Sequence, residues 1–228
     1  MSKAGTLAHV AFDIETTGLD ATDEVTVIGF ELELGCRVFY QTSGRDTDSN
    51  DVETAVQDRT GIHIEVSAHQ SERALLEAVS AFVATRLRSA DVLLVGYNAE
   101  TWHGGFDLPF LRTRYAACDV AWPFRDLPYA DVLPIIRDLF NTMMDGDDPV
   151  ALDTAYEILC AGEAGAADPF NDSGDAVAAF KHGRFEAVVL HNVADIRRTG
   201  QLSSLAQRYC SKSDFNLKSL TPTIDSTD

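Results

Sequence analysis

The sequence predicts an α/β domain with a mixed β-sheet of about five strands and helices on both faces of the sheet. Three observations support this class. Residues 7–40 contain three strand-like runs joined by short turns. From residue 71 onward, amphipathic helical patterns alternate with short apolar runs. The length of 228 residues suits one domain, so we expect a domain over residues 1–210 and a polar tail over residues 211–228.

The beginning of the chain predicts three consecutive strands. Residues 7–16 form a largely apolar run, and residues 25–34 begin with β-branched residues and then alternate. Residues 36–40 follow Gly35 as a hairpin partner. We therefore expect the sheet to begin as a three-stranded unit.

A polar segment separates these strands from the first predicted helix. Residues 42–60 are acidic and rich in Ser, Thr and Asp, which indicates an insertion, and the alternation over residues 62–66 predicts a short extra strand. Ser71 is a suitable N-cap for an amphipathic helix that extends to about residue 89. The apolar run over residues 91–97 is typical of a central strand covered on both faces.

The rest of the chain predicts mainly helices. Pro109 is tolerated in the first turn of a helix, and Asp148 followed by Pro149 suits the start of another. The expected elements are a helix over 106–117, a strand over 129–133, a helix opened by Pro134, and helices over 150–160, 173–181 and 184–209. In the polar tail, Phe215, Leu217 and Leu220 are able to dock on the body of the domain.

The charge of the chain limits its function. The formal net charge is −18, and only 4 of the 18 basic residues are lysines. Such a surface suits a cytoplasm with concentrated salt, where self-repulsion is screened, and a merely acidic protein is the alternative. The chain lacks the broad positive field of generic nucleic-acid binders. Any phosphate substrate must therefore be held by metal ions and a few well-placed groups.

The sequence indicates a cytoplasmic protein without a membrane partner. No apolar run approaches the roughly 20 residues that cross a bilayer, and nothing resembles a signal peptide. The four cysteines are far apart and form no Cys-x-x-Cys pair. We therefore expect reduced thiols and no zinc site.

The most informative segment is Asp13-Ile14-Glu15, where the first predicted strand ends. On a strand, this spacing places both carboxylates on one face, about 7 Å apart along the chain. Two anions at the end of an apolar run repel each other and are costly to desolvate unless a positive charge lies between them. The pattern therefore favours a divalent cation.

Two further acids stand in informative positions. Asp107 follows a predicted buried strand at the opening of a helix, and His191 precedes Asp195 by one helical turn, so the last two share a face. Each residue taken alone has a simpler explanation. Asp107 is a possible N-cap, and Asp195 is a possible surface partner of Arg198 or His191. The conjunction of all these acids in their expected contexts favours metal-dependent nuclease chemistry.

These motifs resemble a known family. Asp13 and Glu15 in Asp-Ile-Glu-Thr-Thr-Gly, Asp107 in Phe-Asp-Leu-Pro-Phe-Leu after Gly-Tyr-Asn, and Asp195 resemble the DEDD superfamily of 3′ to 5′ exonucleases. The segment from Ser71 to Pro109 is similar to the proofreading domain of family B DNA polymerases, and His-Asn-Val-Ala-Asp is similar to the YprB-type ribonuclease H-like proteins. The resemblance implies a ribonuclease H-like fold.

The resemblance also implies a site for two Mg²⁺ or Mn²⁺ ions. Asp13 would bridge the ions, Glu15 and Asp195 would complete the site nearer the attacking water, and Asp107 would hold the second ion. Two such ions about 3.5 to 4 Å apart activate water, neutralise charge on the phosphoryl oxygens and stabilise the leaving 3′ oxygen.

His191 departs from the family pattern. Members of the superfamily place a Tyr four residues or a His five residues before the last Asp, whereas this chain has a His at the four-residue spacing. We expect His191 to orient or deprotonate the attacking water. The backbone of Thr16, Thr17 and Gly18 is expected to approach the terminal nucleotide, since Gly18 has no Cβ to obstruct it. Asn98 is expected to tether the neighbouring loop.

We therefore expect a 3′ to 5′ exonuclease that acts on single-stranded DNA or RNA ends. The alternatives are a structure-selective or endonucleolytic nuclease of the same fold and a non-catalytic nucleic-acid-binding or assembly module. Asp131 either assists the metal site or starts a helix, and His103 is expected as a loop histidine. Four further acids are expected on the solvated surface: Glu100, Asp145, Asp147 and Asp148.

Overall fold

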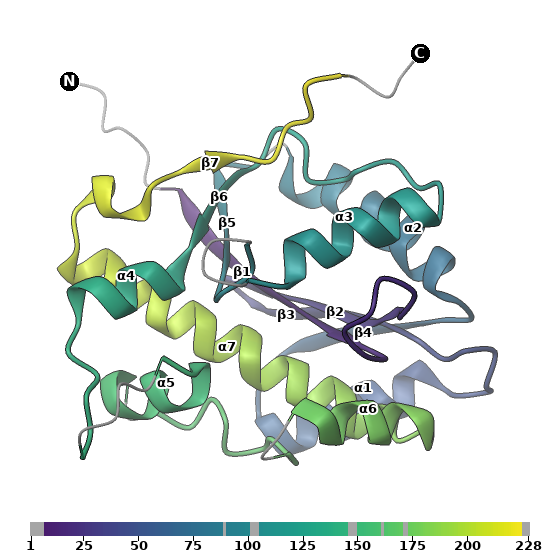
Figure 1. The fold of residues 1–228 in the computed structure, drawn as a ribbon. Coiled ribbons are helices and arrows are strands. Elements are labelled where there is room, and N and C mark those ends of the chain that lie inside the picture. Colours follow the sequence, from purple (N-terminus) through teal and green to yellow (C-terminus); the bar gives the residue numbers. More distant parts are fainter. Residues whose placement is uncertain are drawn as a thin grey trace.

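The computed structural model describes residues 7–88, 90–100, 105–145, 150–160, 162–170 and 173–224. A seven-stranded mixed sheet crosses this part of the chain in the order β4-β3-β2-β1-β5-β6-β7 (Figure 1). The strands are β1 (Ala8–Thr16), β2 (Val25–Leu32), β3 (Gly35–Gln41), β4 (Ile64–His69), β5 (Val92–Gly96), β6 (Pro128–Asp131) and β7 (Lys218–Ser219). Strand β2 is antiparallel to both neighbours, β7 is antiparallel to β6, and the other adjacent pairs are parallel. The predicted α/β class with a mixed sheet is confirmed.

The predicted number of about five strands is too low, because the sheet has seven within the described residues. Strand β4 lies where the alternation of residues 62–66 predicts an extra strand. Strand β7 lies in the segment expected as a polar tail, and its two residues are too few to show alternation. Phe215 and Leu220 of the same segment are buried, whereas Leu217 is exposed.

Helices cover both faces of the sheet (Figure 1). One face carries α2 (Glu72–Phe82), a π-helical turn that continues it over Val83–Leu87, and α3 (Asp107–Ala117). The opposite face carries α1 (Ser49–Thr60), α4 (Val132–Leu139), α5 (Leu152–Cys160), α6 (Ser173–Lys181) and α7 (Phe185–Tyr209), and a short 3₁₀ turn over Lys212–Phe215 follows them. The alternation of β1 follows this division, because Phe12 and Ile14 point toward α2 and α3 while Ala11 packs on the α7 side. Asp13 and Glu15 therefore face α7.

Residues 42–60, which the sequence indicates as an insertion, contain helix α1. Only Val52 and Val56 of this helix are buried, so the apolar stripe is too narrow to stand out in the sequence. The helix is defined by its ends instead. The Asp48 side chain accepts a hydrogen bond from the Asn50 N–H at 2.8 Å, and Gly61 ends the helix in the left-handed region with φ of 68°.

Gly61→Ala is expected to lower the free energy of unfolding by about 1 kcal/mol, because L residues are strained at this φ. Within the described residues, nothing beyond the chain neighbours lies within 4 Å of the Cβ position, so the effect is one of backbone conformation. Gly61→Asn is the matched control and is expected to lose less, because Asn tolerates the left-handed region. Urea unfolding measures both, and equal stability of Gly61→Ala and the wild type would contradict the expectation.

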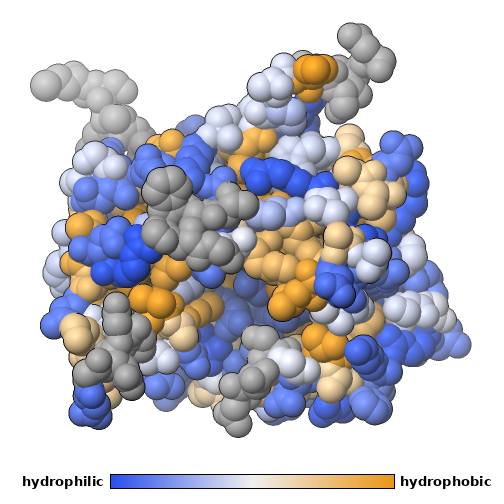
Figure 2. Space-filling model, viewed as in Figure 1, coloured by the Kyte–Doolittle hydropathy of each residue, from blue (hydrophilic) through white to orange (hydrophobic). Residues whose placement is uncertain are grey.

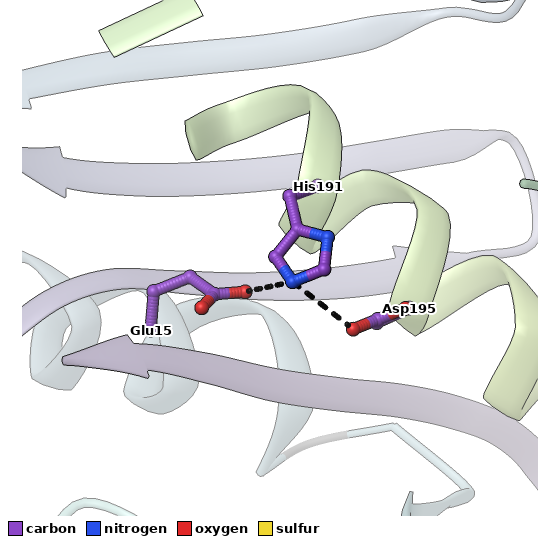
Figure 3. A group of neighbouring side chains, drawn as sticks. All are labelled: Glu15, His191 and Asp195. Atoms are coloured by element: carbon purple, nitrogen blue, oxygen red, sulfur yellow. Dashed lines mark ion pairs between the residues drawn. The ribbon is translucent and has the colours of Figure 1, made fainter. Parts of the chain in front are cut away.

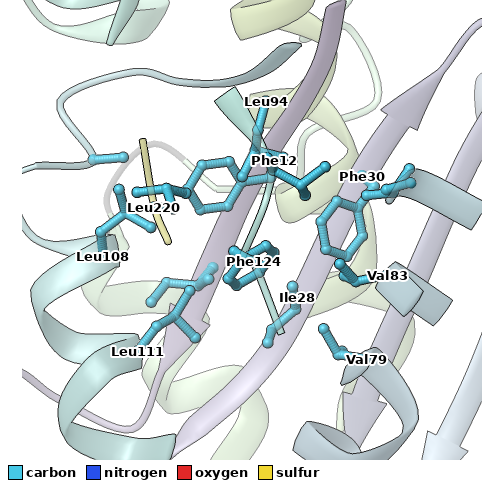
Figure 4. Close-up of a cluster of buried hydrophobic side chains, with 14 of the residues drawn as sticks. Phe12, Ile28, Phe30, Val79, Val83, Leu94, Leu108, Leu111, Phe124 and Leu220 are labelled. Carbon is cyan, nitrogen blue, oxygen red and sulfur yellow. The ribbon is translucent and has the colours of Figure 1, made fainter. Parts of the chain in front are cut away.

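The largest apolar cluster lies between the sheet and helices α2 and α3 (Figure 4). Phe30 of β2 meets Phe124 at a ring-centroid distance of 6.5 Å, and Phe12 of β1 meets Phe124 at 6.1 Å. Val79 and Val83 pack into the same cluster from the α2 side. This core fixes the position of β1 and therefore of the carboxylates that β1 carries.

Two polar side chains fix the start of α2. Ser71 caps the helix as predicted, with its hydroxyl accepting from the Ala74 N–H at 3.3 Å. The Glu72 carboxylate, only 5% exposed, accepts from Arg114 Nε at 2.8 Å and Nη2 at 2.7 Å, and also from the Val25 N–H. This buried pair ties α2, α3 and β2 together.

The face seen in Figure 2 is largely hydrophilic, with apolar patches between the polar side chains. Among the described residues, no helix has the length and apolar character that a membrane crossing requires.

Candidate metal-binding site

A cleft of about 410 Å³ lies between the end of β1, the start of α3 and helices α6 and α7. The cleft is lined by His191 and by the four carboxylates that the sequence singles out: Asp13, Glu15, Asp107 and Asp195. Thr16 and Gly18 line it as well. The fold therefore gathers three distant segments of the chain in one cavity, near the carboxyl end of a central strand, where ligand sites form in open α/β sheets.

Strand β1 delivers Asp13 and Glu15 to the face covered by α7. Asn192 of α7 is fully buried, and its Nδ2 donates to Asp13 Oδ2 at 3.0 Å and to the Asp13 carbonyl oxygen at 3.2 Å. Gly29 of β2 lies opposite Asp13 in the sheet, and a Cβ at Gly29 would overlap Asn192 Oδ1. The absence of a side chain at Gly29 therefore allows α7 to approach β1 closely. Sequence reasoning assigned no role to Asn192, although an Asn in the middle of a helix, next to His191, is unusual.

Helix α7 delivers His191 and Asp195, which share a face at the i, i+4 spacing (Figure 3). His191 Nε2 lies 3.8 Å from Asp195 Oδ2 and 3.9 Å from Glu15 Oε1. One ligand atom from each of these three residues lies within 4.8 Å of the other two. The three side chains converge on one point between β1 and α7, as an ion-binding set requires.

Asp168 and Arg198 support this group from the other side. His191 Nδ1 lies 2.9 Å from Asp168 Oδ1, and Arg198 Nη1 donates to Asp168 Oδ2 at 2.8 Å and to Asp195 Oδ1 at 2.6 Å. Burial lowers the pKa of His191, but the hydrogen bond to Asp168 and the charges of Asp195 and Asp168 outweigh burial and hold the pKa above its ordinary value. The surface pairing of Asp195 with Arg198 that the sequence suggested is present, but it belongs to this buried network. Asp168 was missed, because its loop shows no periodic pattern.

The first residue of α3 is Asp107, and the chain before it is held by Asp131 at the end of β6. The Asp131 carboxylate accepts from the N–H groups of Asn98 at 2.9 Å and Glu100 at 3.3 Å, and it also caps α4 through Leu133 N at 3.1 Å. Asp131 therefore starts α4, which is one of the two roles expected for it, and it also holds the backbone of Asn98 and Glu100.

Crowding of the carboxylates raises their pKa values. Burial raises the pKa of Asp13 well above its usual range, and the charges of Asp107, Glu15 and Asp195 raise it further. The pKa of Glu15 is raised in the same way, first by burial and then by Asp195 and Asp107. Burial, followed by the charges of Asp131 and Asp195, raises the pKa of Asp107 to about 8. A divalent cation would relieve this repulsion and displace the protons.

Two candidates for substrate binding lie outside the cleft lining. The Thr17 hydroxyl donates to Asp23 Oδ1 at 2.9 Å, within the turn that follows β1. Asn98 adopts φ of 57°, and its carbonyl oxygen accepts from the Phe106 N–H at 3.2 Å, so it ties the two ends of the loop through its backbone.

The other acids of the loops have different surroundings. Glu100, expected on the solvated surface, instead forms an ion pair with Lys218 of β7 and is only 13% exposed. Strand β7 pairs with β6 and brings Lys218 into contact with Glu100. Asp145 is exposed as expected. His103, Asp147, Asp148 and the predicted cap at Asp148 lie outside the described residues.

Comparison with known proteins gives no family to place beside this geometry. No protein-family model matches the chain, and no curated protein matches it.

Proposed function

We propose that this protein is a divalent-metal-dependent 3′ to 5′ exonuclease that hydrolyses phosphodiester bonds at single-stranded DNA or RNA ends. One observation carries the proposal: Asp13, Glu15, Asp107 and Asp195 line a single cleft although they come from three distant segments. Four carboxylates that line one cleft, with Glu15 buried and the other three half-buried, repel one another and are unfavourable without cations. An arrangement that persists despite this repulsion is typical of a functional site.

The donor set fits hard divalent cations. Carboxylate oxygens are the ligands that Mg²⁺ and Mn²⁺ prefer, and the cleft offers four such groups. Two ions bound there would supply water activation and charge neutralisation for phosphodiester hydrolysis. The residues of the chain hold and orient these groups, with Asn192 fixing the Asp13 carboxylate and Asp168 fixing the His191 ring.

The strand arrangement also supports the proposal. The meander β1-β2-β3 is followed by β5 and β6, which add in parallel beside β1. These five central strands, with helices on both faces, agree with the ribonuclease H-like sheet that the resemblance implies. The edge strands β4 and β7 extend this sheet.

The size and lining of the cleft favour a chain end as the substrate. A volume of about 410 Å³ lies in the range of small-ligand sites, which suits one terminal nucleotide better than a duplex segment. Gly18 lines the cleft without a Cβ, so the backbone there is open to close approach. The net charge of −18 leaves little general attraction for nucleic acid, so binding must depend on this cleft and its ions.

A cleavage assay tests the proposal. Protein in about 1 M KCl, which screens the charge of the acidic surface, is incubated with 5′-labelled single-stranded and duplex DNA and RNA and with Mn²⁺ or Mg²⁺. We expect a ladder that shortens stepwise from the 3′ end of single strands and disappears with EDTA. Internal cuts would indicate the endonucleolytic alternative. Metal binding without cleavage of any of these substrates would contradict the nuclease and favour a binding module.

A further inference from the structure

We infer that His191 is itself a metal ligand, completing with Glu15 and Asp195 a mixed nitrogen and oxygen site that favours a transition-metal dication such as Mn²⁺ over Mg²⁺. The inference rests on the proposed function only for the identity of the cleft as a metal centre. It replaces the expectation that His191 acts on the attacking water.

The first argument is the position of His191 Nε2 (Figure 3). The side chain is nine-tenths buried, and Nε2 points between the carboxylates of Glu15 and Asp195 at 3.9 and 3.8 Å. Within the described part of the chain, Nε2 makes no hydrogen bond, since both separations exceed hydrogen-bond distance. A ring nitrogen without a hydrogen bond, aimed at two carboxylates within ion-pair distance, indicates a place for a positive group.

The distances from His191 Nε2 to the two carboxylates decide which positive group fits there. A protonated imidazole that paired with these carboxylates would draw them to about 2.7 to 2.9 Å, as charge-assisted hydrogen bonds are short. The observed separations are ion-pair distances but are too long for such hydrogen bonds. Ligand bonds of about 2.1 Å around one ion hold neighbouring ligand atoms roughly 3 to 3.5 Å apart. The separations of His191 Nε2 from Glu15 and from Asp195 would therefore need to shorten by only about half an ångström.

The third argument is the support of the ring. Asp168 holds Nδ1 at 2.9 Å, so a ring that gives up one proton to bind a cation would keep the other on Nδ1 and present the Nε2 lone pair to the cleft. A carboxylate behind a histidine is the usual support of metal-bound imidazole, because it fixes the tautomer and the orientation. Arg198 in turn fixes Asp168 at 2.8 Å. Asp168 and Arg198 together therefore hold the His191 ring rigidly, as a metal ligand requires.

The spacing on α7 explains why this histidine reaches the ligand set. At four residues before Asp195, His191 lies on the same helix face as the carboxylate. A histidine one residue earlier would be rotated by about 100° around the helix axis. The departure of this chain from the superfamily spacing therefore has a structural consequence, which is a nitrogen donor inside the carboxylate group.

The metal preference follows from the donor atoms. Mg²⁺ is bound almost entirely by oxygen, whereas imidazole suits transition metals, and Mn²⁺ accepts both. We expect wild-type protein to bind Mn²⁺ at least about tenfold more tightly than Mg²⁺. Replacing His191 by Ala is expected to weaken Mn²⁺ binding about 10- to 100-fold and to change Mg²⁺ binding little.

Electron spin-echo modulation of Mn²⁺-loaded wild-type protein tests coordination directly. We expect modulation from a directly bound ¹⁴N of imidazole, which is lost in His191→Ala. Calorimetric titration with Mn²⁺ and with Mg²⁺ gives the metal affinities of wild type, His191→Ala and Asp168→Ala. His63→Ala is the matched control, because His63 does not line the cleft. Asp168→Ala is expected to lower Mn²⁺ affinity about tenfold or more by freeing the ring.

The outcomes separate this inference from the proposed function. Mn²⁺ binding to the wild type without nitrogen modulation would overturn the inference, as would the absence of any Mn²⁺ binding. Nitrogen-ligated Mn²⁺ in a protein that cuts no nucleic acid would support the inference and overturn the nuclease. Exonuclease activity with equal affinity for Mg²⁺ and Mn²⁺ would support the nuclease and overturn the inference.

Discussion

Asp13→Asn is expected to slow metal-dependent nucleotide release by about a thousandfold or more, which corresponds to about 4 kcal/mol of transition-state stabilisation. The substitution keeps the shape of the side chain and removes the charge that the proposed ions require. Asp13 lines the cleft, and the charges of Asp107, Glu15 and Asp195 all act on it. The rate of release from a 3′-labelled single strand in Mn²⁺ measures the effect.

The free energy of unfolding of Asp13→Asn shows whether a loss of activity has a chemical cause or comes from misfolding. The native carboxylate is buried among like charges, so its removal is expected to leave the free energy of unfolding of metal-free protein unchanged or higher. Asp58→Asn, an exposed residue of α1, is the matched control and is expected to keep full activity. Nucleotide release by Asp13→Asn at the wild-type rate would refute the proposed nuclease site.

The second large effect is expected in the core rather than in the cleft. Arg114→Met is expected to lower the free energy of unfolding by about 3 kcal/mol or more, because it leaves the buried Glu72 carboxylate without its cation. Guanidinium unfolding measures this difference. The exposed pair of Arg73 with Glu77 provides the control, since Arg73→Met is expected to change stability by about 0.5 kcal/mol or less.

A double variant distinguishes an unpaired charge from lost packing. Combining Arg114→Met with Glu72→Gln removes the buried charge and keeps an acceptor for the Val25 N–H. The double variant is expected to recover most of the stability lost by Arg114→Met alone. If it remains as unstable as the single variant, the effect comes from packing of the Arg114 side chain and the argument from charge is wrong.

Local sequence patterns predict much of this fold. The alternation and β-branched residues of β1, β2 and β3 predict strands, and the Ser71 cap with the apolar stripe behind it predicts α2. Helix α1 and strand β7 escape prediction for a common physical reason. Their own residues bury too little apolar surface to leave a periodic signal, and they are stabilised by end caps or by pairing with β6.

Sequence periodicity also predicts some residues of the candidate site and misses others. Asp13 and Glu15 stand out because a strand period places them on one face, and His191 and Asp195 because a helix period does the same. Asp168 and Asn192 do not stand out, because their roles depend on contacts across the fold. The side chain of Asn192 reaches Asp13 only because Gly29 makes room on a neighbouring strand. This arrangement depends on β1, β2 and α7 together, so the sequence of any one of these elements gives no sign of it.

The contact of Lys218 with Glu100 joins β7 to the loop that precedes Asp107. Helix α7 and β7 follow the segments that carry Asp13, Glu15 and Asp107, so they are synthesised after those segments. A nascent chain that already contains Asp13, Glu15 and Asp107 still lacks His191 and Asp195. The proposed site would therefore remain incomplete until α7 has been synthesised and has packed on β1.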